Sequence, residues 1–212
     1  YNRIKKFGFG NKTNLTLPDE HHGTIWEFSH YTKNPRDLAS STLGQSILAT
    51  NIQMAIAYAS IANGGYVLKP KIVKKIIYEN YVEEYNKPII VRKSMNTATS
   101  RILLDMLKEV VNNGTGKEAY IENMDIGGKT GTAQIWNKLE NRYSNNQYIS
   151  SFASIFPTSD PKYVIIISIE SPEYDKRWGG ESAAPCTRNI IEEILFYDFE
   201  LLNQLSVQHE IT

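Results

Sequence analysis

The chain has 212 residues, of which 41% are hydrophobic and 22% charged, and its formal net charge is +0. This composition is typical of a globular protein with a sizeable core and excludes a disordered chain. The balanced charge argues against electrostatic capture of nucleic acid or of an anionic membrane. No apolar run approaches the ~18 residues that span a bilayer. With one cysteine, Cys186, no internal disulfide can form, and we expect that cysteine to be a small buried residue.

The first 50 residues are rich in turn residues, and a helix is predicted directly after them. His21 and His22 are adjacent and lack the spacing of metal ligands, so no metal site is predicted. Thr50 and Gln53 form a T-x-x-Q capping box, the signature of a helix start. Residues 52–62 are apolar nearly all round, which predicts a buried helix. Asn63-Gly64-Gly65 ends it.

Short strands and a second helix follow. Residues 66–93 contain two apolar stretches on either side of the polar segment 79–87, which predicts a hairpin or a pair of strands. Residues 97–111 repeat apolar side chains at helical spacing. The predicted buried stripe consists of Leu103, Met106, Leu107, Val110 and Val111.

The last third of the chain predicts strands and a terminal helix. A polar loop is expected over 138–147, and strands over 148–156 and 163–170. The second of these strands is apolar without alternation, which is typical of a strand covered on both faces and central in its sheet. A helix is predicted over 184–197 with Ile190, Ile191, Ile194 and Leu195 inward, and residues 198–212 form a C-terminal tail.

Asp125–Trp136 holds the residues that carry chemistry. Its β-branched and aromatic residues predict a strand, on which Thr130 and Thr132 point to the same face. Gly131 between them has no side chain to block an approach to the backbone, and Lys129 adds a positive charge. This arrangement suits a ligand with a carboxylate that lies along the strand.

Two other interpretations of this stretch exist. The lysine can be an ordinary solvent-facing residue on an edge strand. Gly128-Lys129-Thr130 also resembles the end of a phosphate-binding loop, but that pattern needs a glycine where Asn123 stands, and no clear helix follows.

Several segments, in order, resemble the transpeptidase domain of class B, monofunctional penicillin-binding proteins, in its C-terminal half. The family signature is S-x-x-K, S-x-N and K-T-G. The third of these is matched by Gly128-Lys129-Thr130-Gly131-Thr132-Ala133-Gln134. The supporting segments are Phe7–Gly10 with Leu17-Pro18, Leu43–Gln45 with Thr50 and Gln53, Ala62–Gly65, Lys69–Val73, Val110-Val111 with Gly114–Gly116, Phe156-Pro157, Asp160–Tyr163, Gly179-Gly180 and Ala183–Pro185. The wording around Leu38–Gln53 favours the division-type over the elongation-type enzymes.

The resemblance implies an α/β (α+β) fold, with an antiparallel sheet flanked by helices as in serine transpeptidases and β-lactamases and incomplete at its N-terminal side. Residues 1–197 would form the C-terminal part of the domain. The implied reaction is serine acyl transfer to cross-link peptidoglycan stem peptides ending in D-Ala-D-Ala, with β-lactams acylating the same serine and no cofactor. Lys129 would help organise proton transfer, Thr130, Gly131 and Thr132 would bind the substrate carboxylate, and the Thr132 backbone N–H would be an oxyanion donor. Divisome proteins and attachment to the outer face of the cytoplasmic membrane by an N-terminal segment are also implied.

The chain departs from the family at the nucleophile. Its only S-x-x-K is Ser159–Lys162, in a proline turn after K-T-G, where a helix that would place serine and lysine on one face is not expected. Of the two S-x-N matches, Ser94–Asn96 is interpreted as the lead-in to the second helix, and Ser144–Asn146 follows K-T-G out of the family order. We therefore expect the catalytic serine to be absent from this chain and the chain alone to be inactive. The alternatives are a non-catalytic β-lactam sensor or degenerate relative, a β-lactamase, and a generic structural α/β domain.

Overall fold

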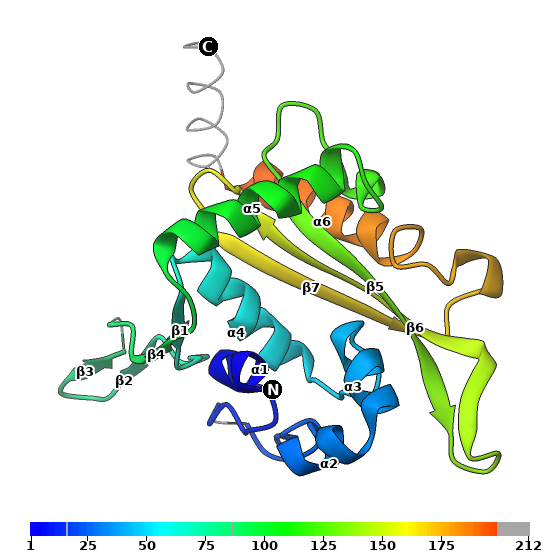
Figure 1. The fold of residues 1–212 in the computed structure, drawn as a ribbon. Coiled ribbons are helices and arrows are strands. Elements are labelled where there is room, and N and C mark those ends of the chain that lie inside the picture. Colours follow the sequence, from blue (N-terminus) through cyan, green and yellow to red (C-terminus); the bar gives the residue numbers. More distant parts are fainter. Residues whose placement is uncertain (16, 86, 199–212) are drawn as a thin grey trace. The chain divides into compact units, whose positions relative to one another are not determined.

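The computed structural model describes residues 1–15, 17–85 and 87–198. The chain divides into two compact units, residues 1–100 and 101–212. The elements mix helices with antiparallel sheets (Figure 1), so the expected α+β class is confirmed.

Short helices fill the first 50 residues, where the sequence indicated mainly turns. They are α1 (Asn2–Phe7), α2 (Phe28–Lys33) and α3 (Pro35–Thr42). The predicted turns are present at residues 8–10 and 18–19, and two turn residues also bound helices: Gly8 closes α1 in the left-handed conformation with φ 101°, and Pro35 opens α3. Glycine and proline therefore marked boundaries of helices too short to show an apolar stripe.

Helix α4 (Asn51–Ala62) begins at the predicted capping box. Thr50 Oγ1 accepts from the Gln53 N–H, and the Gln53 side chain accepts from the Thr50 N–H. The Gln53 amide also donates to the carbonyls of Asn11 and His22, at 2.8 and 2.9 Å, so it holds two loops against the helix start. Only three residues of α4 are fully buried, namely Gln53, Ala57 and Ser60, so the helix is less buried than expected.

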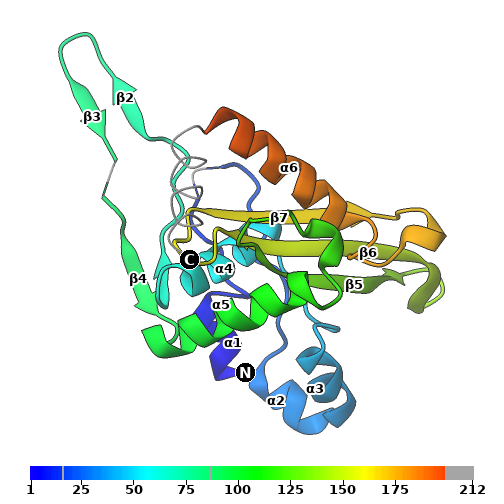
Figure 2. The ribbon, with the colours of Figure 1, turned by 90° about the horizontal axis from the view of Figure 1, so that it is seen from above.

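Residues 66–93 form two antiparallel pairs instead of one hairpin. Strand β1 (Tyr66–Leu68) pairs with β4 (Ile90–Lys93), and β2 (Lys75–Ile77) pairs with β3 (Val82–Glu84). The polar segment 79–87 thus contains a strand. The β2–β3 hairpin continues outward from the β1–β4 pair (Figure 2), and its strands are exposed.

The second unit is built on a three-stranded antiparallel sheet in the order β5-β6-β7. Its strands are β5 (Gly127–Asn137), β6 (Arg142–Phe156) and β7 (Tyr163–Glu170). Strand β6 begins six residues before the expected strand, because residues 142–147 of the expected polar loop belong to β6 and only residues 138–141 form the turn at the tip of the hairpin. Polar residues at this tip hid the strand, although Trp136 and Tyr143 pair across it with ring centroids 5.0 Å apart.

Strand β7 lies at an edge of this sheet, as expected if the sheet is incomplete on that side in this chain. Within the described part of the chain it pairs only with β6, and most of its apolar residues are half-buried. The continuous apolar run was a correct sign that both faces are apolar. It carried no information on how many strands flank β7.

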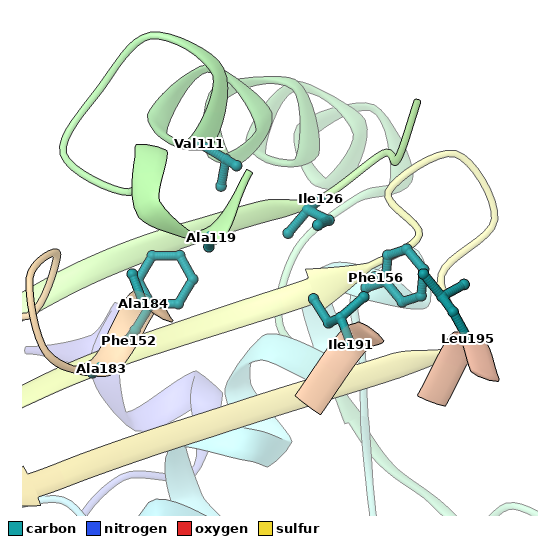
Figure 3. Close-up of a cluster of buried hydrophobic side chains, with 9 residues drawn as sticks. All are labelled: Val111, Ala119, Ile126, Phe152, Phe156, Ala183, Ala184, Ile191 and Leu195. Carbon is teal, nitrogen blue, oxygen red and sulfur yellow. The ribbon is translucent and has the colours of Figure 1, made fainter. Parts of the chain in front are cut away.

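Helices α5 (Thr97–Asn112) and α6 (Ala183–Tyr197) and the short helix η1 (Lys117–Ala119) supply the other side of the core. Figure 3 shows the cluster they form with Ile126 and β6, made of Val111, Ala119, Ile126, Phe152, Phe156, Ala183, Ala184, Ile191 and Leu195. Three predicted positions are wrong: Met106 and Ile190 are exposed, and Cys186 is exposed on α6. Asp198 ends α6, and the remainder of the predicted tail lies outside the described residues. A second short 3-10 helix, η2 (Tyr174–Lys176), lies between β7 and α6 in the chain.

Candidate active site

The K-T-G stretch lies on β5, in register with β6 along its whole length. Lys129 is opposite Ala153, Thr130 opposite Phe152, Gly131 opposite Ser151 and Thr132 opposite Ser150. The predicted strand is therefore present, and residues 130 and 132 share one face of it. Lys129 is exposed, while Thr130, Gly131 and Thr132 are half-buried.

Lys129 keeps its charge available at the strand. Its Nζ donates to the carbonyl oxygen of Thr130 at 2.9 Å, and it makes no ion pair with any described residue. Alternate residues of an antiparallel strand direct their N–H and C=O groups to the same edge. The N–H of Thr132 therefore lies on the edge where the Thr130 carbonyl meets the lysine.

Each of the two hydroxyls has a partner within the chain. Thr130 Oγ1 lies 2.8 Å from Oγ1 of Thr115, a residue of the turn after α5. Thr132 Oγ1 accepts from the backbone N–H of Gly179 at 3.1 Å. A hydroxyl that accepts from an amide retains its own hydrogen to donate elsewhere. The Thr132 hydroxyl can therefore donate its hydrogen to a ligand.

The segment 177–180 packs directly on β5 and β6. Ser150 Oγ donates to the Arg177 carbonyl, and a β-carbon at Gly179 would lie 2.5 Å from the Gly131 carbonyl oxygen. The absence of a side chain at Gly179 thus permits a close backbone approach. The Arg177 guanidinium stacks on Tyr174 and Trp178, 4.2 and 4.9 Å from their ring centres.

An ion pair fixes the segment that leads into β5. Lys108 on α5 pairs with Asp125, whose carbonyl accepts from the Thr158 N–H at 2.8 Å. Burial by itself would raise the pKa of Asp125. Hydrogen bonds from Lys108, Thr158 and Ser159 to the carboxylate outweigh burial and lower that pKa.

The serines of the S-x-x-K and S-x-N matches occupy structural positions in the fold. Ser94 is buried and donates to Gly65 O and Ser60 Oγ, at 3.1 and 3.2 Å. Ser144 accepts the N–H groups of Asn146 and Gln147 in the hairpin tip. Ser159 lies in the turn between β6 and β7.

Sequence reasoning named residues 129–132 but missed their neighbours Thr115, Ser150 and Gly179. Two of these lie in segments the sequence did single out, Gly114–Gly116 and Gly179-Gly180. Nothing in their spacing shows that they converge on β5, because 47 residues separate Gly179 from Thr132. Their meeting depends on how α5 and α6 fold back over the sheet.

Other kinds of site find little support in the described ranges. No group of three His, Cys, Asp or Glu residues there could hold a metal ion. No helix there combines the length and apolar character needed to cross a membrane. A surface hollow of about 770 Å³ lies away from residues 129–132 and is lined by Tyr163, Asn189, Ile190, Glu193, Ile194, Tyr197 and Asp198.

Comparison with known proteins agrees with this fold. The model of the penicillin binding protein transpeptidase domain matches residues 1–192. A peptidoglycan D,D-transpeptidase FtsI homolog of Mesostigma viride is 32% identical over 92% of this chain and 35% of its own length. Stage V sporulation protein D of Bacillus subtilis is 34% identical over 91% of this chain and 29% of its own.

Solved structures give the same answer. Penicillin-binding protein 3 of Mycobacterium tuberculosis, in complex with aztreonam, superposes with a TM-score of 0.84 at 30% identity, over 93% of this chain and 46% of that one. The chain belongs to the penicillin-binding protein transpeptidase domain family. It spans about a third of the length of the curated relatives it matches.

Proposed function

We propose that this chain forms the carboxylate-binding wall of the active site of a peptidoglycan D,D-transpeptidase. The supporting observation is the arrangement on β5: two hydroxyls two residues apart, a glycine between them, and a neighbouring ammonium that makes no ion pair with any described residue. Relatives that share the fold are named as peptidoglycan D,D-transpeptidases, and one solved relative holds aztreonam.

In the proposed reaction a serine Oγ attacks the carbonyl carbon of the penultimate D-Ala of a stem peptide. The C–N bond to the terminal D-Ala breaks, that D-Ala leaves with a proton, and an acyl-serine ester remains. The amine of a second stem peptide then attacks the ester carbonyl, the C–O bond to the serine breaks as the cross-linking amide forms, and a proton from this amine restores the serine hydroxyl. A β-lactam acylates the same serine by opening its ring.

Each residue of the wall has a defined role in this scheme, and Thr132 has two. Lys129 supplies positive charge and organises the proton network around the serine. Thr130 and Thr132 donate to the terminal carboxylate of the substrate, and Gly131 lets it approach the strand. The Thr132 N–H donates to the oxyanion; one such donor contributes about 10²–10³ in rate.

The proposal places the nucleophile outside these 212 residues, in another part of the same protein. The relatives extend well beyond the matched region, which leaves room for it. Division partners, an extracytoplasmic location and an anchor in the cytoplasmic membrane belong to the same proposal. They are what the resemblance to the family implies for the whole protein.

Labelling with a fluorescent penicillin tests the assignment. The protein as its gene encodes it should take up one label per chain, blocked by prior ampicillin, whereas the 212-residue chain alone should take up none. Stoichiometric, ampicillin-sensitive labelling of the 212-residue chain would show that the nucleophile lies within it. Absence of labelling of the gene-encoded protein would overturn the transpeptidase proposal.

Substitutions on β5 test the wall itself. In the gene-encoded protein, Lys129→Met should slow penicillin acylation by about 10²-fold or more, and Thr132→Val by about 10- to 100-fold, because hydrogen bonds to charged groups are the strong ones. The matched controls Lys138→Met and Thr99→Val, both at exposed positions, should leave the rate unchanged.

A further inference from the structure

The contact between Thr115 and Thr130 involves a residue that the proposed function does not use. Thr115 belongs to the G-T-G segment, and its Oγ1 is 2.8 Å from Oγ1 of Thr130. Its side chain is exposed, whereas Thr130 is half-buried, so the pair lies at the surface of the strand.

The turn that carries Thr115 is held firmly in place. The Gly116 N–H donates to the carbonyl of Val110 at 2.9 Å, which closes the end of α5. A β-carbon at Gly116 would lie 2.9 Å from the ring of Phe152, and one at Gly180 would lie 2.2 Å from the Thr115 carbonyl oxygen. The position of Thr115 is therefore set by the core on one side and by the Gly179-Gly180 segment on the other.

The two β5 hydroxyls differ in the direction of their hydrogen bonds. A hydroxyl has one hydrogen to donate and two lone pairs to accept. Thr132 accepts from an amide, which can only donate, so the direction of that bond is fixed. Thr130 faces another hydroxyl, and either oxygen can be the donor.

A bound carboxylate favours one direction of the Thr115–Thr130 hydrogen bond, because an ionised carboxylate only accepts hydrogen bonds. When Thr115 donates to Thr130, the hydrogen of the Thr130 hydroxyl is directed to the ligand. The hydroxyls of Thr130 and Thr132 can then both donate to the carboxylate. If Thr130 instead donates its hydrogen to Thr115, the Thr130 oxygen presents only lone pairs to the ligand.

We propose that Thr115 is a positioning residue for the carboxylate: it donates to Thr130 Oγ1 and so orients the Thr130 hydroxyl as a donor to the ligand. The inference rests on the proposed function, in which Thr130 binds that carboxylate. Thr115 touches neither the ligand nor the reacting atoms, and it acts only through Thr130.

The test measures second-order acylation rate constants of the gene-encoded protein with benzylpenicillin and with its methyl ester. Thr115→Val should slow acylation by the free acid about three- to tenfold, the range expected for one net hydrogen bond. It should leave the rate with the ester unchanged, because the ester has no carboxylate for Thr130 to bind. Thr115→Ser, which keeps the hydroxyl, should restore the rate with the acid.

A double substitution completes the test. Thr115→Val added to Thr130→Val should cause no further loss with the acid, because both changes remove the same interaction. Equal losses with acid and ester, or additive losses in the double variant, would show a merely structural role and overturn the inference. Thermal unfolding of each variant separates these results from a folding defect, and Thr115→Ala provides a second variant without the hydroxyl.

Failure of this inference is distinguishable from failure of the proposed function. If Thr130→Val slows acylation by the acid and Thr115→Val does not, Thr115 has no positioning role and the proposed function stands. If Thr130→Val and Thr132→Val both leave the rate with the acid unchanged, the carboxylate-binding wall itself is wrong.

Discussion

The ring of Phe152 packs directly on the backbone of Gly128: a β-carbon at position 128 would lie 2.3 Å from Cζ of that ring. Phe152 is fully buried in the core of the second unit and is opposite Thr130 in the β5–β6 register. The residue that precedes Lys129 is therefore a glycine for a packing reason. One contact joins the buried core to the strand that carries the candidate site.

Gly128→Ala should destabilise the second unit by about 1–3 kcal/mol, because the added methyl group overpacks a ring that has no space to move. Urea unfolding followed by circular dichroism measures the loss. Gly128→Ala combined with Phe152→Leu should cost less than the sum of the two single changes, because the smaller side chain makes room. Strict additivity would contradict this account of the contact.

The ion pair of Asp125 predicts a pH dependence of stability. Its pKa is lowered in the folded protein, so the ionised carboxylate stabilises the fold above the ordinary pKa of an aspartate, and this contribution is lost as the pH falls through the lowered value. Asp125→Asn should cost about 1 kcal/mol at neutral pH, a small value because Lys108 is 44% exposed and the pair is screened by solvent.

Unfolding curves between neutral and acid pH check this prediction. The difference between Asp125→Asn and the wild type should shrink as the pH is lowered. Asp160→Asn is a suitable control, because Asp160 is 77% exposed and its nearest lysine contact is 3.8 Å. A difference that stays constant with pH would contradict the role of the carboxylate charge.

The buried side-chain amide of Gln53 makes several hydrogen bonds, so its loss should strongly destabilise the first unit. Gln53→Leu removes half of the capping box and leaves the carbonyls of Asn11 and His22 without their donor. We expect a loss of about 2–4 kcal/mol, from the cap and from the unmet hydrogen bonds together. Thermal unfolding measures it, with the exposed Gln147→Leu as the matched control.

Because Gly179 packs closely on β5, a substitution at this position should slow acylation by moving the backbone. In Gly179→Ala the methyl group would meet the carbonyl oxygens of Ser151 and Gly131, at 2.3 and 2.5 Å, so the segment must move away from β5. Thr132 then loses its amide partner, and acylation of the gene-encoded protein by benzylpenicillin should slow about tenfold or more. Stopped-flow acylation measures this rate. An unchanged rate would show that the Gly179 amide does not orient Thr132.

Local signals were sufficient where the cause is local. The helix after Thr50 was predicted to the residue because a capping box is a contact between neighbours in sequence. The strand at 163–170 was predicted with its bounds because its residues all favour extended chain. The K-T-G strand and the shared face of Thr130 and Thr132 follow from the two-residue period of a strand.

The sequence by itself predicted the helix after Thr50, the K-T-G strand, the strand at 163–170 and the family that these segments resemble, and it singled out residues 129–132 as candidate site residues. Only the tertiary structure decided that Thr115 and Gly179 meet the two hydroxyls, and that Met106 and Ile190 face water. The reason is physical. Periodicity and capping act over a few residues, whereas these contacts are fixed by the close packing of segments tens of residues apart.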